Sequence, residues 1–281
     1  TTASIGTRLR TSENVARMRV ELGLSDFSTL AGDTLARVRG ILGSDLVVLG
    51  SYTILGPERD APIRLDLSLQ DAATGQTTAL PAQNATASEL FTLVGTCGVD
   101  LRRALGTAEL KPEETRGVLA AFSTEPDAAR LYAEGLGLLQ RFENEAARAA
   151  LERAVAADPK QPLAHAALAS AWSAAGYDER AIAAAGRAFE LARALPLEQR
   201  LEVEGRYREI ASEWPKAIEI YRTLYGNYPD NLDYGLHLAE ALISAGDSAE
   251  ARAILKDLRA LKAPAGSDPR IDLGEARVGE R

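Results

Sequence analysis

The chain has 281 residues, enough for about two domains, and its 46% hydrophobic and 26% charged residues are typical of a globular protein. Its net charge of −8 argues against a nucleic-acid surface or an anionic membrane as partner. Cys97 is the only cysteine and no run of about 18 apolar residues occurs, so the sequence predicts no disulfide framework, no cysteine-rich metal site and no membrane span.

The chain opens on "TTASIGTRLRT", without a signal peptide, and this abrupt start favours a fragment of a longer protein. Residues 9–22 are ambiguous, and we favour an early strand that runs into a short helix. Residues 33–43 place apolar side chains on one helical face, with Asp33 suited to cap the start and Gly43 suited to end the helix. Residues 45–55 are apolar and β-branched enough for a buried strand.

Residues 63–70, "IRLDLSLQ", alternate strictly between apolar and polar side chains, which predicts a half-exposed antiparallel strand. The inward residues are Ile63, Leu65, Leu67 and Leu69, and the outward residues are Arg64, Asp66, Ser68 and Gln70. Residues 71–76 form a hairpin turn with Gly75 at the positive-φ position. Residues 77–86 are the return strand, in which Pro81 indicates an edge position or a bulge.

"TASE" at residues 86–89 fits a capping box, with Thr86 as N-cap and Glu89 reaching back. The helix that follows runs to about Leu105. Its apolar stripe makes Cys97 a small buried hydrophobe rather than a reactive thiol. The stripe consists of Leu90, Phe91, Val94, Cys97, Leu101 and Leu105.

These elements predict a small α/β (α+β) domain over residues 1–108. The stretches "GSDLVVLGSYTILG" (43–56), "IRLDLSLQDAATGQT" (63–77) and "SELFTLVGTCGVDLRRALG" (88–106) resemble the amino-terminal domain of the translocation protein TolB. They resemble more closely the copies of that domain in bacterial multidomain signalling proteins. Such domains open with a full amphipathic helix, which is missing or cut short here.

Residues 128–281 repeat with a period near 34, and small or apolar residues recur at fixed positions that resemble the tetratricopeptide repeat (TPR). Units start near residues 128, 162, 198 and 232, with a partial fifth from 267. Positions 8, 20, 24, 27 and 32 are Gly135, Ala147, Leu151, Ala154 and Pro159 in the first unit and Gly205, Ala217, Tyr221, Leu224 and Pro229 in the third. Matching residues are Ala169, Ala181 and Ala188 in the second unit, and Ala239, Ala251, Leu255 and Leu258 in the fourth.

The physics of the repeat explains these positions. Small residues at positions 8 and 20 let the two helices of a unit cross closely, and stacked units bury faces that one unit cannot bury alone. The usual aromatic at position 4 is replaced by Leu131, His165, Leu201 and Gly235, and Trp172 and Tyr177 supply some of the missing bulk. Two extra residues within 192–200 lengthen the turn between the second and third units.

Residues 109–127 form a helical linker with Pro112 in its first turn.

No catalytic constellation is present, so we expect neither an enzyme nor a cofactor. The glycines of "EGLGLL" (134–139) lie inside a repeat helix and read as packing residues rather than a phosphate loop. His165 and His237 favour packing or surface roles over a shared metal site. Asp66 and Asp71 favour turn and solvent roles over a paired site.

The concave face of such an array is built from positions 2, 5, 9, 12 and 13 of each first helix. We expect it to bind a protein or peptide partner, a basic one because the later units are acidic; a merely solvated face is the alternative. The Lys/Asn/Arg pattern that binds a chaperone's C-terminal carboxylate is absent. Tyr132, Leu136 and Leu139 are expected to pack on the linker or the α/β domain. The candidate partner-binding residues are Gln140, Ser170, Ser173, Gln199, Glu202, Arg206, Glu209, Asp233 and Glu240.

The two parts together resemble the C-terminal region of certain bacterial serine/threonine protein kinases. This resemblance implies a sensing or protein-binding module beyond a kinase domain and a membrane span, in an extracytoplasmic location; a cytoplasmic one stays open. Similar modules also follow winged-helix or cyclase domains. Alternatives are a freestanding scaffold, or a small-ligand receptor with a cleft between the α/β domain and the first repeat. The stretches concerned are "SENVARM" (12–18), "LVVLGSY" (46–52), "VEGRYREIASEWPKAIEIYRTL" (203–224), "PDNLDYGL" (229–236) and "DPRIDLGEAR" (268–277).

Overall fold

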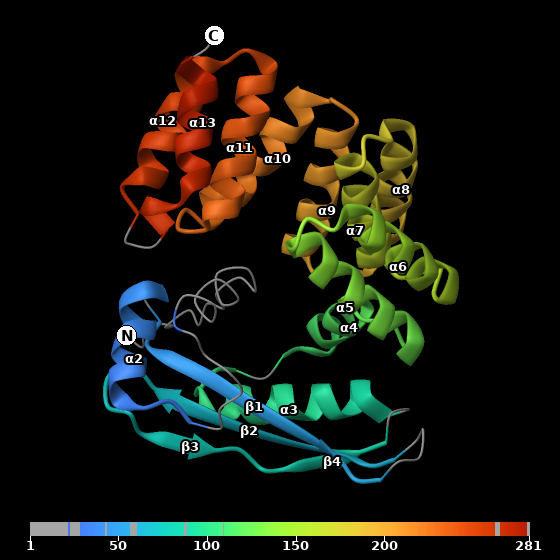
Figure 1. The fold of residues 1–281 in the computed structure, drawn as a ribbon, viewed down its shortest axis with the longest axis vertical. Coiled ribbons are helices and arrows are strands. Elements are labelled where there is room, and N and C mark those ends of the chain that lie inside the picture. The colour runs from blue at the N-terminus through green and yellow to red at the C-terminus, as the bar shows by residue number, and fades with distance from the viewer. Residues whose placement is uncertain are drawn as a thin grey trace. The chain divides into compact units, whose positions relative to one another are not determined.

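The computed structural model describes residues 22, 29–42, 44–56, 61–86, 89–108, 110–261 and 265–279. The chain divides into two compact units, Thr1–Lys111 and Pro112–Arg281 (Figure 1). The early strand and helix expected within residues 9–22, Leu22 aside, and the helix end expected at Gly43 lie outside the described residues.

The first unit contains an antiparallel sheet whose central strand is β2. Strand β1 pairs one side of β2, while β3 and β4 both pair its other side. The return strand expected over residues 77–86 is divided in two, and the break between β3 and β4 falls at Pro81, where an edge position or a bulge was expected. The described elements are α2 (Gly32–Leu42), β1 (Leu46–Ile54), β2 (Ile63–Asp71), β3 (Thr77–Ala79), β4 (Gln83–Ala85) and α3 (Leu90–Ala104).

The prediction that residues 45–55 form a buried strand was wrong about burial. Strand β1 pairs only β2 among the described strands, and Tyr52 and Ile54 are 71% and 56% exposed. Gln70, expected to face outward on β2, is only 3% exposed. The backbone N–H of Leu30 donates to Gln70 Oε1 at 3.0 Å, and Gln70 Nε2 donates to the Leu30 carbonyl at 2.9 Å. The chain before α2 therefore covers a face that alternation alone assigned to solvent.

The hairpin turn forms as predicted. Gly75 has a φ of +74°, a conformation that glycine adopts without steric cost. The Asp71 carboxylate accepts hydrogen bonds from the backbone N–H groups of Ala73 and Thr74, and these bonds lower the pKa of Asp71. Asp66 pairs with Arg64 at 2.9 Å. The two aspartates therefore have the turn and surface roles that the sequence favoured.

The two described helices of this unit start differently from the prediction. The backbone N–H of Thr86 donates to the Glu89 carboxylate at 3.1 Å, as in a capping box, but α3 begins at Leu90 with Glu89 as its N-cap. Asp33 lies in the first turn of α2 rather than before it. On α3, Val94 is exposed and Leu93 is buried instead. Cys97 is buried as predicted, and desolvation raises the pKa of its thiol.

The second unit is a succession of helices that stack in sequence order into a curved array (Figure 1). Each predicted repeat holds two helices, and the lengthened turn contains a short 3₁₀-helix. The linker helix begins at Pro112, as expected. The elements are α4 (Pro112–Ala120), α5 (Pro126–Gln140), α6 (Asn144–Ala157), α7 (Pro162–Ala174), α8 (Asp178–Leu191), η2 (Ala192–Ala194), α9 (Leu197–Ile210), α10 (Trp214–Asn227), α11 (Leu232–Ala245), α12 (Ser248–Arg259), η3 (Ala265–Ser267) and α13 (Pro269–Gly279).

Close helix approach occurs at the positions that the period singled out. A Cβ atom on Gly135 would lie 2.5 Å from Cγ of Leu151, and one on Gly205 would lie 2.9 Å from Cε1 of Tyr221. Gly274, position 8 of the partial fifth unit, comes equally close to the preceding unit: a Cβ atom there would lie 2.8 Å from Cδ2 of Leu255. Position 20 is a fully buried alanine throughout: Ala147, Ala181, Ala217 and Ala251. These contacts confirm a TPR-type solenoid.

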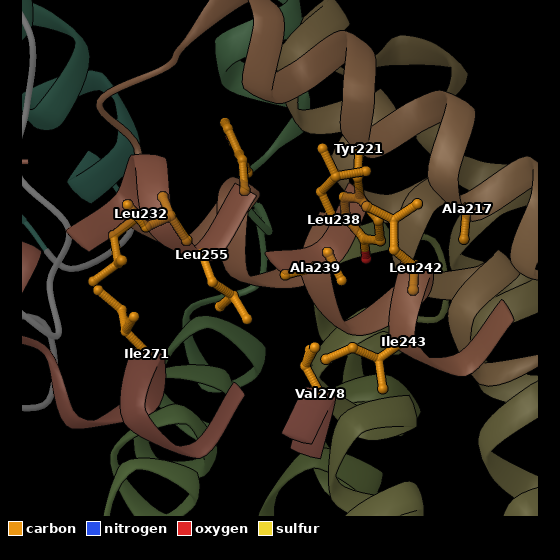
Figure 2. Packing of buried hydrophobic residues seen from close by; sticks show 14 of the residues in the cluster. Ala217, Tyr221, Leu232, Leu238, Ala239, Leu242, Ile243, Leu255, Ile271 and Val278 are labelled. Carbon is orange, nitrogen blue, oxygen red and sulfur yellow. The ribbon is translucent and has the colours of Figure 1, made fainter. Parts of the chain in front are cut away.

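The last helix, α13, completes the core of the array. Ile271 and Val278 are buried among side chains of α11 and α12 such as Leu255 and Ile243 (Figure 2). Earlier in the array, the guanidinium carbons of Arg148 and Arg180 lie 4.9 Å and 4.6 Å from the centre of the Trp172 ring, and Tyr177 contacts that ring edge-on. Trp172 thus supplies buried aromatic bulk within the second unit, as the sequence suggested.

Candidate protein-binding surface

The centre of the candidate surface is Glu209 on α9. Its carboxylate accepts hydrogen bonds from Arg206 at 3.0 Å and from the Tyr221 hydroxyl at 2.7 Å, and Nδ1 of His237 lies 3.3 Å away. Burial opposes ionisation of Glu209, but the His237 and Tyr221 contacts and the Arg206 charge outweigh it and lower its pKa to about 2. The ring of His237 stacks on that of Tyr221 at 5.0 Å. Three helices, α9, α10 and α11, therefore meet at one carboxylate.

Helix α13 supplies cations to the acidic residues of α11. Arg270 pairs with Asp233 at 2.9 Å, and Arg277 pairs with Glu240. Glu209, Asp233 and Glu240, three candidates for binding a basic partner, are thus paired within the array. Their role in partner binding stays a prediction, and their internal pairing reduces the negative charge available to a ligand.

Glu202 differs from these acids. Among the residues that the structure describes, it has no hydrogen bond or ion pair. Its side chain reaches solvent, yet loss of surrounding water raises the pKa of Glu202, and the nearby charges of His237 and Arg206 only partly oppose this. The charges of Glu198 and Asp233 raise it further. Glu202 is therefore a carboxylate without a hydrogen bond or ion pair, in surroundings that hold charges of both signs.

An apolar hollow of about 380 Å³ is lined mainly by the first two repeats, with residues 121–123 of the linker and Gln199 of the third repeat. Tyr132 and Leu136 of α5 line it, together with Leu163 of α7 and Phe122. Burial raises the pKa of Tyr132 to about 12. Oε1 of Gln199 is buried and has no hydrogen-bond partner among the described residues. Leu139 packs with Tyr132 and Leu136 beside the core that contains Trp172.

A second, charged hollow of about 360 Å³ lies between α11 and α13. Its walls carry both signs of charge, from Asp233 and Glu240 on one helix and from Arg270 and Arg277 on the other. Because these groups pair across it, the charged hollow is already electrostatically balanced. Of the remaining predicted residues, Gln140 and Ser173 are exposed. Ser170 accepts a hydrogen bond at 3.5 Å from Arg206, the residue that also donates to Glu209.

His165 is buried, as the packing interpretation required. Its Nε2 lies 3.0 Å from the Pro159 carbonyl, and burial lowers the pKa of the ring. Within the described part of the chain, no group of three His, Cys, Asp or Glu side chains could hold a metal ion. In the same part, every helix is too short or too polar to cross a bilayer.

Sequence reasoning missed the groups that come from a second helix and from the partial fifth unit. The Tyr221 hydroxyl belongs to a residue assigned only to packing, and Arg270 and Arg277 lie on the partial fifth unit. A signal for the two arginines was available: their spacing of seven residues places both on one face of the predicted helix.

Residues 211–276 match the family model of the tetratricopeptide repeat. Two crystal structures of nearly identical TPR-like repeats from a Podosopora anserina chain described as a kinesin light chain are similar, one of them a variant with a single substitution. Each is 19% identical with a TM-score of 0.42 and covers 54% of this chain, and 87% and 82% of those chains. No curated protein matches. The match to residues 211–276 and the repeat contacts give the second unit the fold of a TPR solenoid, whose stacked repeats form an extended surface of the kind that binds other proteins.

Proposed function

We propose that the repeat array captures a basic segment of a partner protein on the face formed by its first helices, with Glu202 as the principal acidic contact. The proposal rests on one observation: the acidic side chains of this surface differ in whether they are paired within the array. Glu209, Asp233 and Glu240 are paired internally, whereas Glu202 is left unpaired one turn away from Arg206. A cation from a partner is the group that this position lacks.

The free energy of an unpaired carboxylate also favours binding of a cation at Glu202. A partly dehydrated carboxylate without a partner costs free energy in the free protein, and a charge-assisted hydrogen bond from Lys or Arg recovers it. Two of the bonds on this surface join different helices: Tyr221 of α10 to Glu209 of α9, and Arg270 of α13 to Asp233 of α11. A peptide that lies along the first helices therefore meets a preformed surface and loses little free energy to reorganisation.

The proposed setting is a non-catalytic sensor region of a bacterial signalling protein, C-terminal to a serine/threonine kinase domain and in an extracytoplasmic location. Two features support it: the kinase-region resemblance of residues 203–224 and 268–277, and the TolB-like resemblance of residues 43–77. In this setting the array recognises a partner, and the attached domain carries the chemistry.

The test is selection of peptides from a random library displayed on phage, with the 281-residue chain as bait. We expect Lys- and Arg-containing peptides to be enriched by the native chain and by Glu179→Lys, which makes the same charge change on the second helix α8. We expect Glu202→Lys to lose that enrichment. Equal enrichment by Glu202→Lys and the native chain would refute the proposal.

A further inference from the structure

The sheet of the first unit has two edges that differ in how they are protected from further strand pairing. At one edge lie β3 and β4, which have three residues each and are separated by Pro81. Short strands and proline commonly block an edge. At the other edge lies β1, which has nine residues, no proline and no charged side chain (Figure 1). It pairs with β2 without a bulge, and no other described strand pairs with it, so its outer side is an unprotected edge.

The face of β1 that it shares with α3 carries exposed apolar side chains. Gln83 of β4 donates to Asp100 of α3 at 2.9 Å, so this side chain lies on the face that the helix covers. Cross-strand partners share a face, and the register runs from Gln83 through Leu65 of β2 to Tyr52 of β1. Helix α3 packs on β4 and β2, whereas the β1 part of the same face is open to solvent. Its apolar side chains, 42% to 71% exposed, are Leu46, Val48, Tyr52 and Ile54.

The size of this apolar strip suits a reversible contact between two copies of the chain. Its exposed fractions correspond to roughly 400 Å² of accessible surface, the size at which an apolar patch on a monomer is often functional. Two copies contribute up to roughly 800 Å² before the backbone of the two edges is counted, which lies at the weak end of specific interfaces. An association through this strip should therefore be measurable and should reverse on dilution.

The sequence of β1 is complementary to itself about Gly50. When two copies of the strand pair antiparallel with Gly50 opposite Gly50, all nine residues find a partner. On the α3 side, Val48 then faces Tyr52 of the second copy, and Leu46 faces Ile54. Pairs of aliphatic side chains, and of an aromatic with a β-branched side chain, are favourable across antiparallel strands. The two glycines leave the two-fold axis free of side chains, and no like charges oppose each other.

We propose that two copies of the chain associate through β1, in an antiparallel pair centred on Gly50 that joins their sheets into one. The pairing provides partners for the outward N–H and C=O groups of both edge strands and brings their apolar strips together. A second copy fits this edge because β1 offers itself a strand of equal length and matching apolar pattern. Such a dimer holds two repeat arrays in one assembly, and it does not depend on the proposed function.

The experiment is sedimentation velocity of the 281-residue chain at concentrations from about 1 μM to about 200 μM. We expect the mass to rise from 30.0 kDa toward twice that value. Val48→Lys and Tyr52→Glu each place a charge opposite an apolar side chain and should each raise the dissociation constant at least tenfold. An equimolar mixture of the two variants should associate again, because the new lysine of one chain faces the new glutamate of the other in the proposed register.

Phe142→Lys is the matched control, because it replaces an 86% exposed apolar side chain of the repeat array and should associate like the native chain. A native chain that stays monomeric over the whole range would overturn the inference. The same holds if the two β1 variants associate like the native chain, or if their mixture fails to associate. Circular dichroism checks that each variant is folded. If a charged variant unfolds, Val48→Thr and Tyr52→Thr replace the pair, since threonine keeps the strand preference, and an unchanged dissociation constant would again overturn the inference.

Discussion

Nδ1 of His237 lies 3.3 Å from Oε2 of Glu209, and this contact joins the first helices of two neighbouring repeats. The same carboxylate accepts from Tyr221, on the second helix between them. A single side chain therefore ties α9, α10 and α11 together. The Glu209 side chain is only 16% exposed, and the loss of its charge weakens its contacts with Arg206, Tyr221 and His237 together.

Replacement of Glu209 should destabilise the array. Glu209→Gln removes the charge that holds Arg206 and one acceptor for Tyr221, and we expect a loss of about 1–3 kcal/mol in the free energy of unfolding. Urea unfolding followed by circular dichroism measures it. Glu190→Gln breaks an exposed ion pair with Arg187 and should cost less than about 1 kcal/mol. Equal effects of the two variants would contradict the central role of Glu209.

The ionisation of Glu209 should also make the stability of the array depend on pH. The pKa of Glu209 in the folded state is about 2, below its ordinary value of 4.5, so its stabilising effect is present above pH 4.5 and is lost as the pH falls toward 2. Glu209→Gln lacks this contribution. The difference in stability between the native chain and the variant should therefore shrink between about pH 6 and pH 2. A difference that stays constant over this range would show that Glu209 does not titrate with a lowered pKa.

Glu202 should have the opposite effect on stability. Its pKa is raised in the folded state, so its ionised form is disfavoured at neutral pH and the cost disappears as the pH falls through its folded-state pKa. Glu202→Gln should therefore raise the melting temperature at about pH 7 and leave it nearly unchanged at about pH 4. A lower melting temperature at neutral pH would mean that Glu202 is paired within the array, against the proposed role in partner binding.

Two glycines on one helix test the packing rule of the repeats. A Cβ atom at Gly135 would lie 2.5 Å from Leu151, so Gly135→Ala should destabilise the array by about 1–3 kcal/mol through overpacking. Gly137, two residues further along α5, would meet only the Arg141 side chain at 3.6 Å. Gly137→Ala should stabilise the helix by up to about 1 kcal/mol. Chemical denaturation of both variants measures the contrast, and a similar effect at the two positions would contradict the close approach of α5 and α6.

The repeat architecture could be predicted from the sequence because its signal is periodic and its physical cause is local. Positions 8 and 20 need small side chains wherever two helices cross, and the chain supplies them at each turn of the period. The sheet could be predicted only in part. Alternation identified β2 as a strand, but the burial of Gln70 depends on Leu30, forty residues earlier, and no local pattern reveals that contact.

The candidate surface, like the sheet, could be predicted from the sequence only in part. The acids of the first helices could be located from their positions, but their pairing depends on side chains from the next repeat. Ser170 and Arg206 are 36 residues apart, and Asp233 and Arg270 are 37 apart, close to one period. Pairs at this separation could be sought in the sequence.

The most direct test of the account is the affinity of a selected basic peptide for the native chain, Glu202→Lys and Glu179→Lys, measured by calorimetry at two salt concentrations. The account predicts that Glu202→Lys weakens binding at least tenfold, since a charge-assisted hydrogen bond of about 1.5–3 kcal/mol is lost and a repulsion replaces it. It also predicts that Glu179→Lys binds like the native chain and that added salt weakens native binding. Unchanged affinity in Glu202→Lys would contradict the account.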